Sequence, residues 1–196
     1  IYLDGVLVGG YTGGNLLHVS GSIYTNGMVS GYIDGSGNLQ QGGEVRLYRI
    51  RKGWETLTYD QVRLDAAEIY ETTVSGVSDA QIQLVLDQYE ADWNNWPVHL
   101  GAPFYDLDND GLYEPADGET PGIADADQVI WYVVSDADVG TTSSLYGCTP
   151  IGIEVQYTLW GYNQPGAALG QIVFKNVRVI NKGTEDLTDA YISLWS

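Results

Sequence analysis

The sequence is poor in several residue types, and each shortage excludes a class of protein. Its 196 residues contain one cysteine, Cys148, so an internal disulfide is impossible and no zinc or haem spacing occurs. No apolar run approaches the roughly 20 residues of a membrane-spanning helix. Only 8 Lys+Arg accompany 26 Asp+Glu, a formal net charge of -18, which argues against a basic surface for nucleic acid. The two histidines, His18 and His99, lie in no metalloprotease or Ser–His–Asp context.

What remains is typical of a folded, β-rich protein. Apolar residues make up 44% and aromatic residues 12% of the chain, enough for a sizeable core. We expect one β-rich module over residues 1–196. The chain begins without Met or a signal peptide and stops inside a strand-like pattern at 191–196, so we expect a fragment of a longer chain. Cys148 is expected to be a small half-buried residue or to pair outside this fragment.

Periodicity predicts a mainly β (α+β) fold, sandwich-like, with a two-helix insertion at 59–96. Asn26-Gly27 and Asp34-Gly35 are typical hairpin turns. The insertion has apolar residues at helical spacing, and Ser78 to Gln81 is a capping box between its helices. Alternating or continuous apolar runs predict the main strands; these are residues 45–50, 128–134, 151–160, 171–180 and 188–195. The last two are expected to form a hairpin or consecutive sandwich strands.

Negative charge is concentrated in one region of the chain. No Lys or Arg occurs between Arg63 and Lys175, and that interval holds 18 of the 26 acids. Ten of those acids fall between Asp106 and Asp138. An acidic run is often only a solvated surface, but here the order of the acids favours a cation site.

The most specific motif in the sequence is a predicted calcium loop, which lies within an acidic segment at residues 103–127. Residues 106–117 (DLDNDGLYEPAD) place carboxylates at loop positions 1, 3 and 5 and Gly111 at position 6, where a sharp turn is needed. Position 7 supplies a backbone carbonyl and position 12 a carboxylate. The predicted Ca²⁺ ligands are Asp106, Asp108, Asp110, Leu112 and Asp117.

Two features of this region leave alternatives open. Position 12 is Asp117 instead of the longer Glu, which makes bidentate closure less assured, and an empty acidic turn is the competing interpretation. A second acidic cluster, Asp125, Asp127, Asp136 and Asp138, flanks the strand at 128–134. A straight strand would separate its two pairs by about 20 Å, so solvated strand ends are favoured over a second calcium site.

Short segments carry two resemblances. Pro103 and Pro115 leave the loop without flanking helices, and it resembles the calcium loops of dockerins and thrombospondin type 3 repeats. From about residue 40 onward the chain resembles long, uncharacterised secreted proteins of Bacteroidetes and Ignavibacteria-type bacteria. The segments concerned are VRLYRIRK (45–52), DWNNWP (92–97), GAPFYDLDNDGLYEPAD (101–117), ADQVIWYVV (126–134), PIGIEVQYTLW (150–160) and 173–196. This resemblance implies export, through type IX secretion, to a cell-surface or extracellular setting.

The expected function is structural: a non-catalytic, calcium-stabilised module of a large exported cell-surface, matrix or filament protein. Its expected partners are the rest of its own chain and, as an alternative, further copies in a surface filament or layer. A carbohydrate-binding or glycan-processing module is the second hypothesis. Under this second hypothesis, Glu154 is the candidate catalytic acid. Five tryptophans could form a sugar-stacking face, although aromatic residues at such spacings are more often part of a core. They are Trp93, Trp96, Trp131, Trp160 and Trp195.

Overall fold

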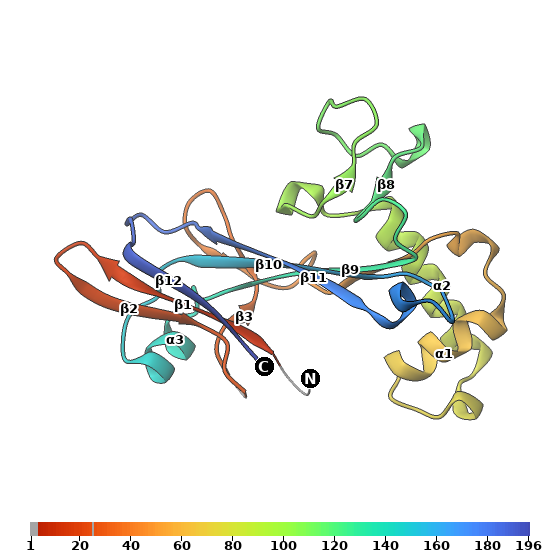
Figure 1. The fold of residues 1–196 in the computed structure, drawn as a ribbon, viewed down its shortest axis with the longest axis horizontal. Coiled ribbons are helices and arrows are strands. Elements are labelled where there is room, and N and C mark those ends of the chain that lie inside the picture. The colour runs from red at the N-terminus through yellow and green to blue at the C-terminus, as the bar shows by residue number, and fades with distance from the viewer. Residues whose placement is uncertain (1–3, 25) are drawn as a thin grey trace. The chain divides into compact units, whose positions relative to one another are not determined.

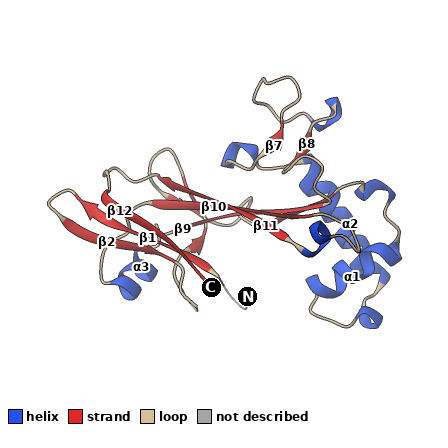
Figure 2. Cartoon of the chain, in the orientation of Figure 1, coloured by secondary structure: helices blue, strands red, loops and turns tan. Residues whose placement is uncertain are grey.

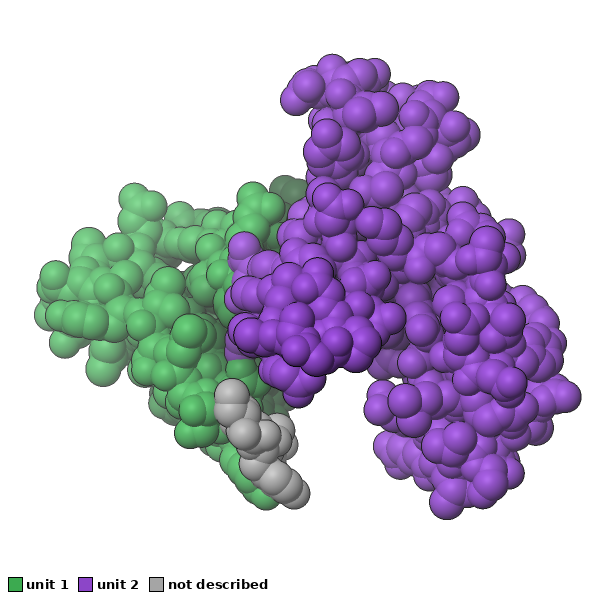
Figure 3. Space-filling model, turned by 45° about the vertical axis from the view of Figure 1, so that its right-hand side comes forward, with its two compact units in different colours: residues 1–46, 132–157, 177–196 green, residues 47–131, 158–176 purple. Residues whose placement is uncertain are grey.

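The computed structural model describes residues 4–24 and 26–196, which form two compact units (Figure 3). Unit 1 comprises residues 1–46, 132–157 and 177–196, and unit 2 comprises residues 47–131 and 158–176. The described residues form twelve strands and three α-helices (Figure 2), so the predicted mainly β, α+β class is confirmed. None of their helices has the length and apolarity needed to cross a membrane.

One antiparallel sheet is built from the two ends of the described chain (Figure 1). Its order is β12 (Thr188–Trp195), β1 (Gly5–Thr12), β2 (Leu16–Gly21). Val8 of β1 lies opposite Ile192 on one side and Ser20 on the other. Val6 and Val8 are buried, whereas nearly all of β12 is exposed. One face of β1 therefore belongs to a core, while every residue of β12 except Trp195 is exposed.

The second sheet has the order β11-β10-β9-β3, and β6 also pairs with β9. Its strands are β3 (Val29–Ser30), β6 (Tyr48–Arg51), β9 (Gln128–Ser135), β10 (Ile153–Gly161) and β11 (Val173–Asn181). β9 is central, as its apolar sequence predicts. β10 differs from the alternation expected, because its polar side chains Glu154, Gln156 and Thr158 are buried together with the apolar ones. β11 and β12 lie in different sheets, so the hairpin alternative is wrong and consecutive strands of two sheets are found.

Two short ladders complete the strand content. β4 (Tyr32–Ile33) pairs with β5 (Leu39–Gln40), and β7 (Phe104–Tyr105) pairs with β8 (Thr120–Pro121). The Asp34 side chain forms the first turn, because its Oδ1 accepts from the N–H groups of Ser36 and Asn38 at 2.8 and 2.9 Å. These hydrogen bonds lower the pKa of Asp34, that from Asn38 contributing most. The turn predicted at Asp34-Gly35 is confirmed.

The two-helix insertion is confirmed at 59–96. It consists of α1 (Tyr59–Ile69) and α2 (Asp79–Asn94), joined through a 3₁₀ turn at Val74–Gly76. Ser78 Oγ accepts from Gln81 N at 3.3 Å, and Gln81 Oε1 accepts from Ser78 N at 2.9 Å, which is the predicted capping box. The two helices share an apolar cluster of Val62, Ala66, Ala67, Val77, Ile82, Val85 and Tyr89.

Several elements were not predicted from the sequence. α3 (Val139–Tyr146) begins at Asp138, whose Oδ1 accepts from Thr141 N at 2.7 Å, and ends at Gly147 with φ 71°. Four further 3₁₀ turns lie at Trp54–Thr56, Val98–Leu100, Pro115–Asp117 and Ala168–Gln171. Cys148 is half-buried, and its Sγ lies 3.4 Å from both the N and the O of Val19.

Candidate metal centre

The acidic loop, residues 106–119, connects β7 to β8 within unit 2 (Figure 1). The two strands contribute only two residue pairs, Phe104 with Pro121 and Tyr105 with Thr120. A ladder this short is weak alone, so the conformation of the loop must rest on contacts of its own side chains.

The first half of the loop is wound by its own aspartates. Asp106 accepts from Asn109 N through Oδ1 at 2.7 Å and from Gly111 N through Oδ2 at 3.0 Å. Asp108 Oδ1 accepts from Asp110 N at 3.2 Å, and Asp110 Oδ1 accepts from Leu112 N at 2.7 Å. Each of these aspartate side chains thus accepts a hydrogen bond from a backbone N–H two to five residues further along the chain. Gly111 has φ 81°, the left-handed conformation predicted for position 6.

Glu119 closes the second half of the loop. Its side chain is buried, with 4% of the residue exposed, although the rest of the loop is largely open to solvent. The two carboxylate oxygens accept from Leu107 N and Glu114 N, each at 2.9 Å. One carboxylate therefore joins the start, the middle and the end of the loop, and it lies at the base of the aspartate turns.

Five carboxylates converge in two overlapping groups. Asp106, Asp108 and Glu119 can bring one oxygen each within 4.8 Å of one another, and Asp108, Asp110 and Glu114 can do the same. Asp108 belongs to both groups. Oxygen donors in this number and charge are what a hard divalent cation such as Ca²⁺ requires.

The structure brings together three of the five ligands predicted from the sequence, Asp106, Asp108 and Asp110. Asp117 ends the 3₁₀ turn Pro115–Asp117 and belongs to neither group. Its role as the closing ligand stays a prediction, as does that of the Leu112 carbonyl. Glu114 and Glu119 were not identified from the sequence. Glu114 stands at loop position 9, where calcium loops often place an oxygen, so the spacing itself held that signal.

The charge of the loop acts on Glu114 in particular. The nearby carboxylate of Asp110 raises the pKa of Glu114, and burial and the charges of Asp117, Asp108 and Glu119 act in the same direction. A carboxyl group with a raised pKa in the folded state stabilises the fold at low pH and loses that contribution as the pH rises through the folded-state pKa. The loop therefore favours either a proton or a cation at this position.

Tyr113 attaches the loop to α2. Its hydroxyl donates to the Trp93 carbonyl at 2.8 Å, and its ring meets Phe104 edge-on at a centroid distance of 5.7 Å. Burial, followed by the charge of Glu119, raises the pKa of Tyr113. The order of the loop is thereby coupled to the helical part of unit 2.

In the part of the chain that the structure describes, no member of the second acidic cluster belongs to either group of converging carboxylates. Asp125 pairs with Lys52 at 3.1 Å, and Asp127 Oδ2 accepts from Asn163 N at 2.7 Å. Asp138 caps α3. The expectation of a solvated residue is wrong for Asp136, which is 1% exposed and accepts from the three consecutive N–H groups of residues 151–153.

The candidate residues for glycan chemistry have mostly structural positions. Glu154 is buried, and its carboxylate accepts from Ile33 N at 3.0 Å and from Gln156 Nε2 at 2.9 Å. Trp96 and Trp131 are also buried, and Tyr48 meets both rings edge-on. These two tryptophans are part of the core, which is the more common position of aromatic residues and not that of a sugar-stacking face.

Comparisons with known proteins add no identification. The chain matches no protein-family model, no curated protein and no solved structure. The functional argument therefore depends on the residues and their geometry alone.

Proposed function

We propose that this chain is a non-catalytic, calcium-stabilised structural module of a large exported cell-surface or extracellular protein. The observation that carries the proposal is the convergence of Asp106, Asp108, Asp110, Glu114 and Glu119 within one loop. Their ligand atoms are all oxygens, and a set of several carboxylates suits the six to eight ligands of Ca²⁺ better than the strict octahedron of Mg²⁺, which usually keeps several waters.

Calcium would act here by holding the acidic loop in its folded conformation. Mutual repulsion of the carboxylates opposes that conformation, and a divalent cation removes the repulsion. Through Tyr113 and Trp93 the ordered loop would in turn support α2. A cation that binds only the folded state stabilises it by mass action, which suits permanent reinforcement better than signalling.

The β12-β1-β2 sheet of unit 1 supports the proposal that the chain belongs to a larger assembly. β12 is its outermost strand in the described chain, and large apolar side chains on both of its faces are exposed: Tyr191 by 77%, Ile192 by 60% and Leu194 by 65%. An exposed apolar edge strand readily pairs with another chain, so soluble proteins normally cover it. We propose that the remaining parts of the same protein, or a second copy, cover β12.

The finer fold assignment is also a proposal. The burial of Val6 and Val8 on one face of β1 supports a sandwich in which the β12-β1-β2 sheet forms one layer. The Tyr146 hydroxyl donates to the Gly21 carbonyl at 2.8 Å, and His18 Nδ1 lies 2.9 Å from the Thr149 carbonyl. These contacts connect β2 to the segment that follows β9.

The test is thermal unfolding with and without calcium. With a dissociation constant on the order of 10⁻⁴–10⁻³ M, about 10 mM Ca²⁺ should add about 1.4–2.7 kcal/mol to the free energy of unfolding. The melting temperature should then rise by roughly 3–10 °C over that of chelated protein. Mg²⁺ at the same concentration should have a smaller effect.

A matched pair of variants assigns the effect to the loop. Asp108→Ala removes the residue common to both carboxylate groups and should abolish the calcium-dependent rise. Glu90→Ala removes an exposed acid from α2, outside the loop, and should retain the full rise. An equal rise in both variants would show that calcium binds elsewhere, and no rise in the parent protein would refute the proposal.

A further inference from the structure

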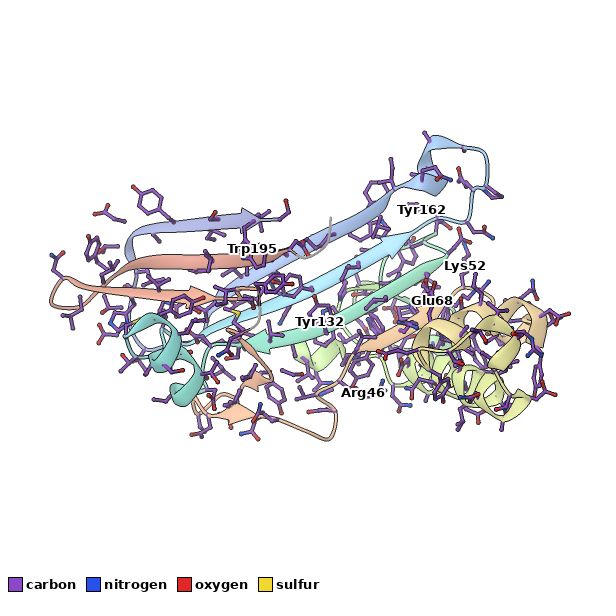
Figure 4. All side chains as sticks on the ribbon, turned by 90° about the horizontal axis from the view of Figure 1, so that it is seen from below. Arg46, Lys52, Glu68, Tyr132, Tyr162 and Trp195 are labelled. Atoms are coloured by element: carbon purple, nitrogen blue, oxygen red, sulfur yellow. The ribbon has the colours of Figure 1, made fainter. Side chains whose placement is uncertain are left out.

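The β12-β1-β2 sheet of unit 1 has two outer edges, and they differ in what lies against them. At the β2 edge, the Sγ of Cys148 lies 3.4 Å from both the N and the O of Val19, and the Tyr146 hydroxyl donates to the Gly21 carbonyl at 2.8 Å. At the other edge, β12 pairs with β1 and with no further strand of the described chain. Figure 4, in which Trp195 is labelled, shows β12 as the outermost strand of this sheet.

β12 lacks the features that normally protect an exposed edge strand. It is eight residues long, contains no Pro or Lys, and carries one charged residue, Asp189, near its start. The irregularity in its pairing with β1 precedes Tyr191, so residues 191–195 form a regular ladder. β11, an edge strand of the other sheet, carries Lys175 and Arg178. A long, regular and nearly uncharged edge such as β12 readily pairs with another strand.

The two faces of β12 show what a partner strand must supply. Directly opposite residues of neighbouring strands point to the same face, so Ile192 and Leu194 share the face of Val8 and Val6, with which they pair. Val6 and Val8 are buried, whereas Ile192 and Leu194 are more than half exposed. Tyr191 is exposed on the opposite face. The apolar layer of β1 therefore continues onto β12 and ends there uncovered.

Both ends of β12 are fixed within unit 1. Trp195 Nε1 donates to the Ser22 carbonyl at 2.8 Å, and the Trp195 ring lies so close to Gly5 that a Cβ atom there would come within 2.7 Å of it. Just before the strand, the Glu185 carboxylate accepts from Gly13 N at 2.9 Å. The edge is thus preformed, which lowers the entropy cost of pairing with a second strand.

A second copy of the chain offers a matching strand. When two identical strands pair antiparallel across a two-fold axis, one residue lies opposite itself and its neighbours pair across the axis. With Ser193 at the axis, Ile192 would pair with Leu194 of the second copy on one face, and Tyr191 with Trp195 of the second copy on the other. Apolar and aromatic cross-strand pairs of this kind stabilise sheets.

Charge favours the same arrangement. Contact between two copies of formal charge -18 is least costly where acids are few, and the interval from Arg63 to Lys175, which holds 18 of the 26 acids, lies outside β12. A basic partner would be attracted to that interval instead. In the antiparallel register the two Asp189 residues would be about 27 Å apart, well beyond the Debye length of about 10 Å at 0.1 M ionic strength. In a parallel pair they would be only about 5 Å apart and would repel each other.

We propose that two copies of this chain pair through β12, antiparallel and with Ser193 on the two-fold axis. The result is one continuous six-stranded sheet with the order β2-β1-β12-β12-β1-β2, in which the apolar layers of both copies join. This names the partner in the assembly part of the proposed function. β12 shares no residue with the acidic loop, so the pairing does not depend on calcium.

Sedimentation equilibrium of the intact chain, between about 1 and 500 µM, tests the association. We expect a monomer–dimer equilibrium with a dissociation constant on the order of 10⁻⁵ M, because a single strand edge is a small interface. The same value is expected in calcium and after chelation.

Charged substitutions locate the interface. Ile192→Lys and Tyr191→Lys, one on each face of β12, should each raise the dissociation constant at least about tenfold, since each places two like charges in the interface. Leu84→Lys, at an exposed apolar position of α2, should associate like the parent. The melting temperature of each variant shows whether it is folded.

Disulfide trapping tests the register in a Cys148→Ser background. Ser193→Cys should form a disulfide-linked dimer under mild oxidation, because directly opposite Cα atoms lie about 5 Å apart. Tyr191→Cys would place its two copies about 14 Å apart along the strands, too far for a disulfide, and should be trapped much more slowly.

Three results would overturn the proposal. They are a monomer at every concentration up to about 500 µM, unchanged association in both lysine variants of β12, and equal trapping rates of the two cysteine variants. The calcium proposal is tested separately by melting at about 1 µM protein, where the monomer predominates. Failure of one proposal therefore leaves the other decided on its own data.

Discussion

At the scale of single residues, buried carboxylates in this protein are held by backbone N–H groups. Asp92, Glu119, Asp136 and Glu154 are the acids buried among the described residues, and each accepts from at least one N–H of another segment. With 26 acids and 8 basic residues, the chain has too few Arg and Lys residues to pair with most of its acids. Backbone donors give such charges hydrogen bonds without a counter-ion.

The sequence could not distinguish these acids from the exposed ones. Asp136 and Asp138 both follow β9, and the sequence predicted solvated strand ends for both. Burial of Asp136 depends on contacts with residues 151–153 at the start of β10, which lie 15 to 17 positions further along the chain. Burial raises the pKa of Asp136, and the three N–H groups oppose that effect.

Removal of the Asp136 carboxylate should therefore be costly. Asp136→Ala leaves three buried N–H groups without an acceptor, and we expect a loss of about 3 kcal/mol in the free energy of unfolding, measured by urea denaturation. Glu90→Ala removes an exposed acid of α2 and should change stability by less than about 0.5 kcal/mol. Equal effects of the two substitutions would mean that the N–H contacts to Asp136 do not stabilise the fold.

At the scale of elements, local patterns were predicted well and distant pairings were not. The capping box at Ser78 and the apolar stripe of α2 are local signals, and both are confirmed. α3 was missed because its sequence, VGTTSSLY, is rich in Gly, Thr and Ser, which are poor helix formers. The pairing of β12 with β1 joins residues up to 190 positions apart, as in Gly5 with Trp195, and no local pattern encodes it.

In the acidic loop, too, the local features were predicted from the sequence and the longer-range contact was not. Its spacing predicted the aspartates and the Gly111 turn, both of which act over a few residues. The role of Glu119 depends on the 3₁₀ turn Pro115–Asp117 and on Gly118, with φ 96°, which together direct the chain so that the Glu119 side chain lies beneath the loop. A twelve-residue template ends at Asp117 and cannot include this contact.

A pair of substitutions tests which acid would close the proposed calcium shell. Glu119→Gln should weaken calcium binding by roughly 10–100-fold, because the residue is both a candidate ligand and the acceptor for Leu107 N and Glu114 N. Asp117→Asn should weaken it by less than about threefold, since only the long-range charge changes. Calcium titration calorimetry of both variants measures this, and the reverse order would restore Asp117 as the closing ligand.

At the scale of the whole molecule, the concentration of acids between Arg63 and Lys175 is the dominant electrostatic feature. Self-repulsion in this interval opposes folding of the calcium-free protein. Screening by salt weakens repulsion between exposed charges that lie further apart than the Debye length, about 30 Å at 0.01 M and about 10 Å at 0.1 M ionic strength.

Added salt should therefore stabilise the calcium-free protein. We expect its melting temperature to rise by several degrees, on the order of 1 kcal/mol, between about 0.01 and 0.5 M NaCl. If calcium binds as proposed, protein loaded with it should respond less, because the bound cation would already neutralise part of the loop. Differential scanning calorimetry of both forms measures the difference, and a larger salt response in the calcium-loaded form would contradict this account.

The location of the acidic loop also determines which proteases can report on it. Trypsin cleaves after Lys and Arg, so residues 64–174, which include the loop, contain no tryptic site in any conformation. Chymotrypsin cleaves after Leu and Tyr, and the loop displays Leu107 and Leu112 with 55% and 60% exposure. Paired digests therefore separate loosening of this loop from opening of the flanking basic segments, using nothing more than a gel.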